Sequence, residues 1–494
     1  MNSSAAEDFG ERRRHPVGML LAALGTIRRW IGAASFPGIA ALINGQFGMR
    51  TLILVLLIAV LICVFSAVWG VLSWRATTYR VSGGAFHLKR GVLQKSERSL
   101  PLERIQSVNT VQGIAQRLFG VVEVRVEAAG GGEEPEISLP ALSRNDARIL
   151  REEVTRTRRA SGEASAFLQE GPSQTVLRSL SLRDLLVAGM TSGQIGIAAS
   201  VVVGASQMVD ELLPRDLAER LSEGLLPRTG SAILLIVFAF ALFAWVLAIL
   251  GTVLAYAGFT LSRSADGKYL HITRGLLSRY ETTVPLNRIQ AVKVVEGVLR
   301  QPFGLTTVRV ESAGFAEERG ISTILFPLLP HEEVEEFVRT AAPSFAASLE
   351  GLKPLPARGR RRYAFRAALP VLLVSTLVSI FYFPWGLSVL LLALPAALYG
   401  FLRHRAAGHG LDGDRLVLRF RRLALTTVVA SRGRLQSRGY SVSPFQRRRG
   451  LATLKVEVAS GSGGAAFRLA DVEAVSAVGL AERLGPPEVV TAEV

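Results

Sequence analysis

The stretch PLERIQSV at residues 101–108 returns almost unchanged as PLNRIQAV at residues 285–292, 184 positions further along the chain. The same offset aligns VRVE at residues 124–127 with VRVE at residues 308–311. Agreement in one register over about forty residues indicates a repeated structural module, and a repeat constrains the architecture before any local pattern does. The chain therefore contains at least two copies of one module.

A weaker third copy lies at an offset of 330 from the first. Arg434-Leu435-Gln436 stands at the position of Arg-Ile-Gln, and LKVE at residues 454–457 stands at the position of VRVE. This copy departs from the others in its turns, since Arg421 replaces the glycine of an Arg-Gly pair and Ser431 replaces the proline before Arg-Ile-Gln. We therefore expect a binding face shared by the first two modules to be altered or lost in the third.

The composition indicates a membrane protein with strongly basic parts outside the bilayer. Of 494 residues, 49% are hydrophobic, and the formal net charge is nevertheless +17. Soluble globular proteins rarely combine these two properties, whereas membrane proteins with basic cytoplasmic segments do so routinely. The single cysteine, Cys63, lies within an apolar run, so neither a disulfide framework nor a thiolate metal site is available.

Three uncharged stretches are long enough to cross a bilayer, for which a helix needs about 20 apolar residues. Residues 51–74 and 232–256 each predict one transmembrane helix. Residues 367–402 are too long for a single span and contain Phe-Pro-Trp-Gly at residues 383–386. They therefore predict two short helices joined by a tight hairpin.

Two further stretches, residues 30–49 and 185–209, also lack charges but are rich in glycine, alanine and serine. Small residues suit helices that pack closely against other helices, which favours two more spans buried against their partners. A buried or interfacial helix that does not cross the membrane is the alternative for each. The favoured interpretation gives about six helices in three hairpins, and each hairpin returns the chain to the side that it left.

The distribution of charge predicts which side the modules occupy. Arginines crowd the segments beside the modules, for example residues 156–159 and 358–362, whereas the loop over residues 205–228 carries five acidic side chains against three arginines. Positively charged flanks remain in the cytoplasm. We therefore expect a multi-pass protein of the bacterial plasma (inner) membrane with all three modules on the cytoplasmic side.

Within one module, the pattern of apolar residues predicts a small antiparallel sheet followed by one helix. In the first copy, Gly83-Gly84 and Arg90-Gly91 mark hairpin turns between short strands. VVEVRVEA at residues 121–128 alternates between apolar and charged residues, as a half-buried strand does. Ser143 precedes an amphipathic stretch and is expected to cap its helix. The module is therefore α+β and dominated by strands.

Four strings in the first module carry a resemblance to a known family: YRV at residues 79–81, LKRGVL at 88–93, LPLERIQSV at 100–108 and RLFGVVEVRVEAAG at 117–130. They resemble the bacterial pleckstrin-homology-like (PH-like) domain, formerly catalogued as a domain of unknown function. The whole chain resembles the YdbT-type membrane proteins. The resemblance implies that each module is a partly open antiparallel barrel with a C-terminal helix. It implies no activity, because PH-like folds bind lipids, peptides and proteins alike.

The expected organisation is α-helical transmembrane hairpins alternating with three α+β, mainly β, PH-like domains. The hairpins are expected at residues 30–74, 184–257 and 365–402, and the PH-like domains at residues 75–160, 258–342 and 403–485, the last of them divergent. The other segments are a basic N-terminus at residues 1–29, linkers at 161–183 and 343–364, and a tail at 486–494.

No set of residues indicates catalysis, a metal or a cofactor. His87 and His271 share one strand position in the first two modules, but no carboxylate, cysteine or second histidine stands nearby at metal-ligand spacing, so we interpret both as ordinary strand residues. Phosphate-binding glycine loops and nucleophile motifs are absent from the sequence. The predicted spans carry essentially no charge, which argues against a transporter core. We expect no enzymatic activity and no cofactor.

Binding is then the expected activity, with two alternatives. Three modules on one chain could act together as a protein-binding scaffold or accessory subunit, because partner strands can add to exposed sheet edges. A smaller PH-like membrane protein is one expected partner. Alternatively, basic residues beside the bilayer could bind anionic phospholipid headgroups. A component of a transport or export complex is a second alternative, and the sequence does not distinguish envelope maintenance, stress resistance and export as processes.

The residues singled out for either role are basic and either recur or cluster: Lys89, Arg90, Arg104, Arg288, Arg434, Arg447, Arg448 and Arg449. Arg104, Arg288 and Arg434 occupy one position in the three copies. Two structural alternatives stand beside a binding role. A cytoplasmic flank is basic whether or not it binds lipid, and the recurring arginine could pair with a recurring glutamate at residues 127, 311 and 457. Nucleic acid is not an expected partner, because topology explains the charge and aromatic stacking platforms are lacking.

Overall fold

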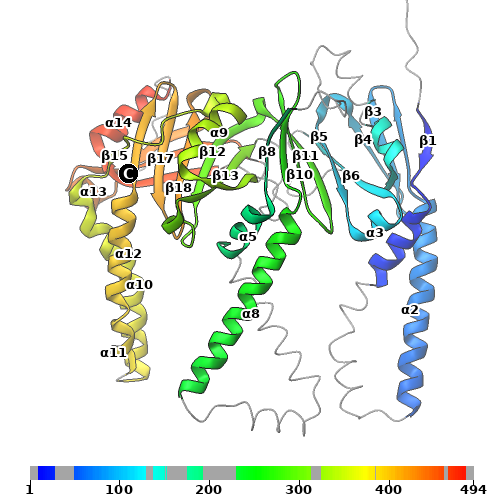
Figure 1. Cartoon of the computed structure of the whole chain (residues 1–494), viewed down its shortest axis with the longest axis horizontal. Coiled ribbons are helices and arrows are strands. Elements are labelled where there is room, and N and C mark those ends of the chain that lie inside the picture. The colour runs from blue at the N-terminus through cyan, green and yellow to red at the C-terminus, as the bar shows by residue number, and fades with distance from the viewer. Residues whose placement is uncertain are drawn as a thin grey trace, which may run out of the picture. The chain divides into compact units, whose positions relative to one another are not determined.

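The computed structural model describes residues 9–27, 49–128, 137–150, 152, 175–192, 230–312, 324–383, 385–460 and 465–485. The chain divides into two compact units, one of residues 1–129 with 135–283 and one of residues 284–494 with 130–134. The boundary falls inside the second module, so that each unit holds one half of it. Figure 1 shows the elements of both units.

The first unit begins with a four-stranded antiparallel sheet in the order β1-β2-β3-β4 (Figure 1). Its strands are β1 (Phe9–Arg13), β2 (Thr78–Ser82), β3 (Ala85–Arg90) and β4 (Ser96–Pro101). Gly83 and Gly84 form the predicted turn between β2 and β3, and both have positive φ angles. The turn after β3 requires Gly91, because a Cβ atom there would lie 1.8 Å from the carbonyl oxygen of Gln94.

A seven-stranded antiparallel sheet follows, in the order β7-β6-β5-β11-β10-β9-β8. Three of its strands come from the first module and four from the second: β5 (Ile105–Gln112), β6 (Val121–Ala128), β7 (Ile137–Ser143), β8 (Thr175–Ser179), β9 (Thr260–Arg263), β10 (Tyr269–Arg274) and β11 (Arg279–Pro285). The predicted alternation in β6 is confirmed, since Val122, Val124 and Val126 are buried. The cap at Ser143 is also confirmed, because its Oγ accepts a hydrogen bond from the Asp146 amide at 3.0 Å.

The core of the first module lies between these two sheets. Phe86 from the first sheet packs in one cluster with Ile105 and Leu139 from the second, and all three are fully buried. A single-turn 3-10 helix, η1 (Leu102–Arg104), carries the chain from β4 to β5 and buries Leu102 completely. Both sheets remain open, and neither closes on itself as a barrel.

The second unit repeats this plan with the end of the second module and the whole of the third. Its seven-stranded sheet has the order β14-β13-β12-β18-β17-β16-β15, and a three-stranded sheet has the order β19-β20-β21. The strands are β12 (Ile289–Glu296), β13 (Leu305–Ser312), β14 (Ile324–Pro330), β15 (Lys353–Pro354), β16 (Gly408–Asp412), β17 (Arg415–Arg421), β18 (Leu425–Ser431), β19 (Leu435–Ser441), β20 (Leu451–Val458) and β21 (Ala465–Glu473). Helix α9 (Val334–Ala341) ends the second module, and α14 (Ala474–Arg483) ends the third.

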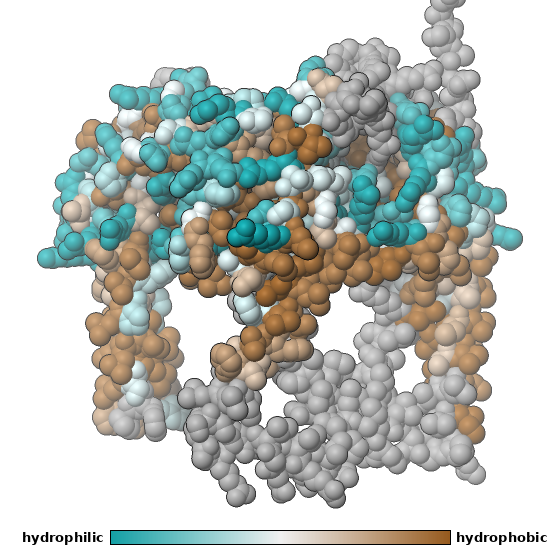
Figure 2. Space-filling view, viewed as in Figure 1, coloured by the Kyte–Doolittle hydropathy of each residue, from teal (hydrophilic) through white to brown (hydrophobic). Residues whose placement is uncertain are grey.

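Four helices in the described part of the chain are long and apolar enough to cross a membrane. They are α2 (Met49–Arg75), α8 (Gly230–Tyr256), α10 (Arg360–Phe381) and a stretch over Leu387–Ala406 that includes α12 (Ala393–Ala406). At most 17% of any of these windows is buried, and Figure 2 shows apolar residues covering the helices. Such continuous apolar surface is stable in lipid rather than in water.

The predicted break at residues 383–386 is confirmed, since α10 ends at Phe381 and α11 (Trp385–Leu390) begins beyond it. Helices α10 and α12 pack against each other (Figure 1). Gly400 permits the close approach, because a Cβ atom there would lie 2.3 Å from the carbonyl oxygen of Tyr363. This is the use of small residues that helix pairs in membranes favour.

Each membrane segment is flanked by two strands that pair with each other. β1 pairs with β2 around the first segment, β8 with β9 around the second, and β15 with β16 around the third. A chain that leaves a sheet and re-enters it at the neighbouring strand returns to the side of the membrane from which it started. The strands β1, β8 and β15 lie in segments where the sequence pattern indicated only a basic tail or a linker.

Two predicted spans remain, residues 30–49 and 185–209. Most of each, residues 30–48 and 193–209, lies outside the described residues, as do the acidic loop 205–228 and the arginines at 156–159. The described start of the second is helix α5 (Leu182–Met190), which packs on α8 at Gly189. An apolar helix over Val17–Ile27 precedes the first.

Candidate functional site: the strand edges of the modules

The first two modules are joined by a pair of strand edges. β5 of the first module pairs antiparallel with β11 of the second, within one continuous sheet. Gln112 lies opposite Arg279, Val111 opposite Tyr280, and Thr110 opposite Glu281. The ladder runs between sequence positions that are more than a hundred residues apart, with the second membrane segment between them. Main-chain pairing therefore makes the two modules one sheet.

The second and third modules are joined in the same way. β12 pairs antiparallel with β18 over six residue pairs, among them Val295 opposite Thr426. The junction is apolar: Val294 and Val428 are both 1% exposed, and Ala291 of the second module belongs to the core cluster of the third. Burial of these side chains adds hydrophobic stabilisation to the main-chain hydrogen bonds.

The two junctions have one register. The repeat offset of 184 places Val111 at the position of Val295, and the alignment of Arg288 with Arg434 places Tyr280 at the position of Thr426. Val111 faces Tyr280, and Val295 faces Thr426. The modules therefore associate through a defined geometry that occurs twice in one chain.

In the described part of the chain, two edge strands are the repeat counterparts of the strands that form these junctions. β4 ends the four-stranded sheet and is the counterpart of β11 and β18. β19 ends the three-stranded sheet and is the counterpart of β5 and β12. Residues 96–99 of β4 are all exposed, and β19 exposes Gln436 and Ser437. A sheet edge of each kind is thus available for a further strand.

The recurring arginines occupy one structural position. Arg104, Arg288 and Arg434 are each the last residue of a single-turn 3-10 helix that leads from one sheet to the next, in η1, η2 (Leu286–Arg288) and η7 (Arg432–Arg434). The carbonyl oxygen of Arg288 accepts hydrogen bonds from Gln290 Nε2 at 2.9 Å and from Ser312 Oγ at 3.3 Å. The recurring arginine therefore lies at the turn between two sheets, and in the second module its main-chain carbonyl accepts two hydrogen bonds.

The glutamate that could have paired with the recurring arginine has another ionic partner in the second module. Glu311 forms an ion pair with Lys293, and its other carboxylate oxygen accepts a hydrogen bond from Ser460 Oγ at 3.2 Å. In the third module, Glu457 is exposed. In the second module, Glu311 therefore pairs with Lys293 rather than with the recurring Arg288.

The remaining predicted residues lie on other elements. Lys89 Nζ is 3.9 Å from Glu97 Oε1, and Arg90 is exposed at the end of β3. These two residues of β3 lie opposite the beginning of β4, whereas Arg104 follows the far end of β4, so the length of a strand, about 17 Å, separates them from Arg104. In the third module, residues 447–449 are exposed on and after the short helix α13 (Pro444–Arg447). The predicted basic residues therefore form several small groups.

Two hairpin turns of the modules lie against the ends of membrane helices. Gly275 N donates to the carbonyl oxygen of Ala257 at 2.8 Å, and Leu276 N donates to that of Leu254 at 2.9 Å, both at the end of α8. In the third module, Arg403 Nε of α12 donates to the carbonyl oxygen of Arg421 at 3.0 Å. The turns expose leucines, Leu276 at 51% and Leu423 at 73%. Apolar tips beside arginines are suited to the interface of a bilayer.

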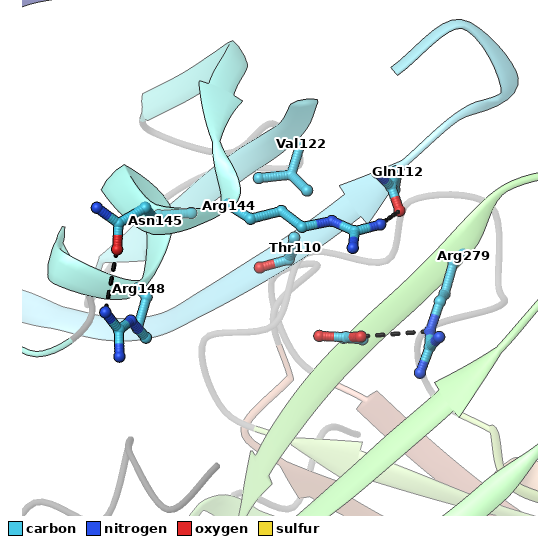
Figure 3. A pocket seen from close by; sticks show the side chains of 9 residues that line it. Thr110, Gln112, Val122, Arg144, Asn145, Arg148 and Arg279 are labelled. Carbon is cyan, nitrogen blue, oxygen red and sulfur yellow. Dashed lines mark hydrogen bonds and ion pairs between the residues drawn. The ribbon is translucent and has the colours of Figure 1, made fainter. Parts of the chain in front are cut away.

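Sequence reasoning missed a basic pocket of about 440 Å³ at the first junction (Figure 3). Arg144 crosses it and donates to Gln112 Oε1 at 3.3 Å, while Arg279 of β11 lies 3.3 Å from Glu281. The lining also includes Thr110, Asn145 and Arg148. Its arginines come from two distant parts of the chain, residues 144–148 and residue 279, and belong to no motif. The second junction has His331 and Glu335 at the positions of Arg144 and Arg148, so this basic lining is particular to the first.

The two histidines that share one position in the first two modules both lie on strands. His271 lies on β10 and its Nδ1 is 3.0 Å from Thr283 Oγ1 of β11, while His87 lies opposite Arg80 and Ser99 in its sheet. Among the described residues, no group of three or more His, Cys, Asp and Glu side chains could hold a metal ion.

Comparison with known proteins agrees with this architecture. The model of the bacterial PH domain family matches residues 20–158, 212–344 and 367–484. The UPF0699 transmembrane protein YdbT of Bacillus subtilis (strain 168) is 32% identical to this chain over 467 residues, which cover 91% of this chain and 93% of that protein. The three matched regions contain the three repeats, each with part of the membrane segment that precedes it.

Proposed function

This chain belongs to the bacterial PH domain family, and we propose that it is a non-enzymatic membrane protein that presents its three PH-like modules as a protein-binding scaffold or accessory subunit. The family comparisons support the three repeats, and the fold contains membrane-spanning helices. The proposal concerns the role of the modules, the side of the membrane that they occupy and the surface through which they bind.

One observation carries the proposal: the modules already bind each other through strand edges, in one register, and two edges of the same kinds end their sheets in the described chain. Addition of a strand to an edge supplies main-chain hydrogen bonds without a deep cleft, and side chains on the strand supply selectivity. Several weak sites on one chain act together through their high local concentration.

The charges at the ends of the third hairpin support a cytoplasmic position for the modules. Helix α10 begins with Arg360, Arg361 and Arg362, and the last turn of α12 contains Arg403, His404 and Arg405. Both ends adjoin the paired strands β15 and β16, so the basic ends of the hairpin are those that meet the module. Basic ends stay in the cytoplasm, which favours the inner face of the plasma membrane.

The role as a scaffold is tested by crosslinking in cells, followed by capture of the tagged full-length protein and mass spectrometry. We expect a stoichiometric protein partner whose recovery falls at least tenfold when Ser96 and Ser441, one on each open edge, are changed to aspartate. The matched control changes Arg339 and Arg483 to alanine, which removes exposed basic charge from the helices that end the second and third modules and should leave recovery intact. Equal recovery from both variants would argue against the strand edges. The identity of the partner would distinguish envelope maintenance, stress resistance and export.

A second candidate function, binding of anionic phospholipids, is favoured by the two turns at the ends of α8 and α12. They bring exposed Leu276 and Leu423 to the expected depth of the headgroups, and Arg421 and exposed Arg422 directly precede Leu423. Arginines there would each contribute about 1 kcal/mol towards acidic lipids. The full-length protein in nanodiscs of mixed composition would enrich anionic lipid around itself, and a variant with alanine at residues 421 and 422 would enrich less. Enrichment that is equal in both proteins would count against this candidate.

A further inference from the structure

We propose that the open edge of β19 pairs with the open edge of β4 in a second copy of this chain, in the register of the two internal junctions. The inference rests on the proposed function, in which modules bind through strand edges, and it names the partner. Each copy carries one edge of each kind, so two copies offer each other the strand that each sheet lacks in the described chain.

The two internal junctions define the register of this contact independently and agree. Ser441 is the counterpart of Val111 and Val295, at the repeat offsets. Ser96 is the counterpart of Tyr280 and Thr426. Since Val111 faces Tyr280 and Val295 faces Thr426, Ser441 of one copy faces Ser96 of the other. A single register follows from either junction.

The side chains brought together in this register are compatible. Tyr440 faces Glu97, and Gly439 faces the long side chain of Arg98, where it leaves room. Ser437 faces Leu100, and no two like charges lie directly opposite each other, an arrangement that would destabilise paired strands. All of these residues lie on β4 or β19.

The contact is expected to be weaker than the internal junctions. The junction of β12 with β18 buries valine and alanine, whereas residues 96–99 of β4 are exposed polar or charged residues. Charged edge strands avoid indiscriminate pairing, so such an edge selects a matching strand rather than any strand. Confinement of both copies to one membrane raises their effective concentration and favours a weak specific contact.

The two edges differ, and the contact is therefore heterologous. Each pair of copies leaves one β4 edge and one β19 edge available, so association continues in the plane of the membrane as an open chain or closes as a ring. This distinguishes the proposal from an ordinary twofold dimer, in which both copies use the same surface.

The test is disulfide crosslinking between two differently tagged full-length copies in native membranes, with Cys63→Ser in both to remove the single native cysteine. One copy carries Ser441→Cys and the other Ser96→Cys, both nearly isosteric changes. Directly opposed residues in antiparallel strands have Cα atoms about 4.5–5.5 Å apart, which suits a disulfide. We expect a species of two chains that contains both tags. A chain with Val295→Cys and Thr426→Cys provides the positive control, because these residues face each other within one copy.

The matched control pairs Ser441→Cys with Ser99→Cys, three residues out of register and so about 10 Å away. Crosslinking at least fivefold above this control supports the inference, and equal crosslinking overturns it as random collision. Absence of the mixed species while the positive control forms also overturns it. If a chain carrying both Ser96→Cys and Ser441→Cys closes only within itself, the second copy is excluded. Capture of a different PH-like protein through the same edges would overturn the second copy as occupant but leave the proposed function standing.

Discussion

Asp471, which is completely buried in the third module, accepts a hydrogen bond at Oδ1 from Arg362 Nε of helix α10 at 3.2 Å. Arg366, one turn further along α10, contacts the other carboxylate oxygen, and Gln446 Nε2 donates to Oδ1 at 2.9 Å. The carboxylate thus joins a membrane helix to the sheet domain that follows it. The φ angle of Asp471 is 58°, a left-handed conformation that Asp and Asn tolerate better than other residues with a side chain.

We therefore expect Asp471→Ala to destabilise the third module by about 3 kcal/mol, because removing one partner of a buried ion pair strands the other charges. Asp471→Asn should cost clearly less, since it keeps an acceptor oxygen and the backbone conformation. The measurement is protease resistance of the module against temperature in detergent. Glu473→Ala is the matched control, because it removes only the exposed ion pair with Arg358 and should have almost no effect. Equal melting of the Asp471→Ala variant and the wild type would contradict the prediction.

Gly400 gives a second prediction, at the contact of α10 with α12. Gly400→Ala places a Cβ atom 2.3 Å from the carbonyl oxygen of Tyr363, so the two helices must separate. We expect a loss of stability of about 1–3 kcal/mol, typical of overpacking, measured by thermal unfolding in detergent.

The control for this prediction is a second helical glycine with no such neighbour. Gly479 lies in α14, and a Cβ atom there has no contact within 4 Å. Gly479→Ala should leave stability unchanged or raise it by up to about 1 kcal/mol, because alanine favours helix. A loss of stability at Gly400 without a loss at Gly479 is the expected result, and a loss of the same size at both positions would contradict it.

Local patterns in the sequence account for the parts of the fold that depend on neighbours in the chain. The turn at Gly83-Gly84, the cap at Ser143 and the break at residues 383–386 each follow from the conformational preference of one or a few residues. The repeat itself required no structure, because the comparison of residues 101–108 with 285–292 already separates the modules.

The pairing of edges could not be predicted in this way. Thr110 and Glu281 face each other across the first junction, but alternation in β5 and β11 shows only which side chains are buried and not which edge each strand will meet. β15 contains only Lys353 and Pro354, and two residues cannot establish a period. The pocket with Arg144 and Arg279 was missed for the same reason, since it exists only once the sheets have joined.

The recurrence of one arginine had suggested a binding role or an ion pair. In the fold, Arg104, Arg288 and Arg434 each end the 3-10 turn between two sheets, so recurrence follows already from an equivalent place in each module. Their part in binding stays a prediction, and the edges now provide a more specific surface than the basic residues did.

The second unit also predicts a pH dependence, through His331. Its Nδ1 lies 3.3 Å from Glu296 Oε1, and the hydrogen bond with this carboxylate raises the pKa of His331 above its ordinary value of 6.5, against the opposing effect of burial. Arg419 lowers the pKa and Glu350 raises it further. Because the folded state holds the proton more tightly, the pair contributes stability that is complete below pH 6.5 and is lost as the pH rises through the folded pKa. His331→Gln should remove this contribution, no more than about 1 kcal/mol for a pair this exposed.

The pKa of His409 in β16 is shifted in the opposite direction to that of His331, so the two histidines affect stability at opposite ends of the pH range. Burial, with the charge of Lys353 on the neighbouring strand, lowers the pKa of His409 below 6.5. The neutral form is therefore favoured on folding, and its contribution is complete above pH 6.5 and lost as the pH falls through the folded pKa. Hydrogen exchange of the second unit, measured at about pH 6 and at about pH 8, reports the contributions of both histidines to stability. His331→Gln should weaken protection only at the lower pH, whereas His409→Gln should lessen the loss of protection on acidification. Identical pH profiles for the two variants would contradict the assignment of these opposite signs.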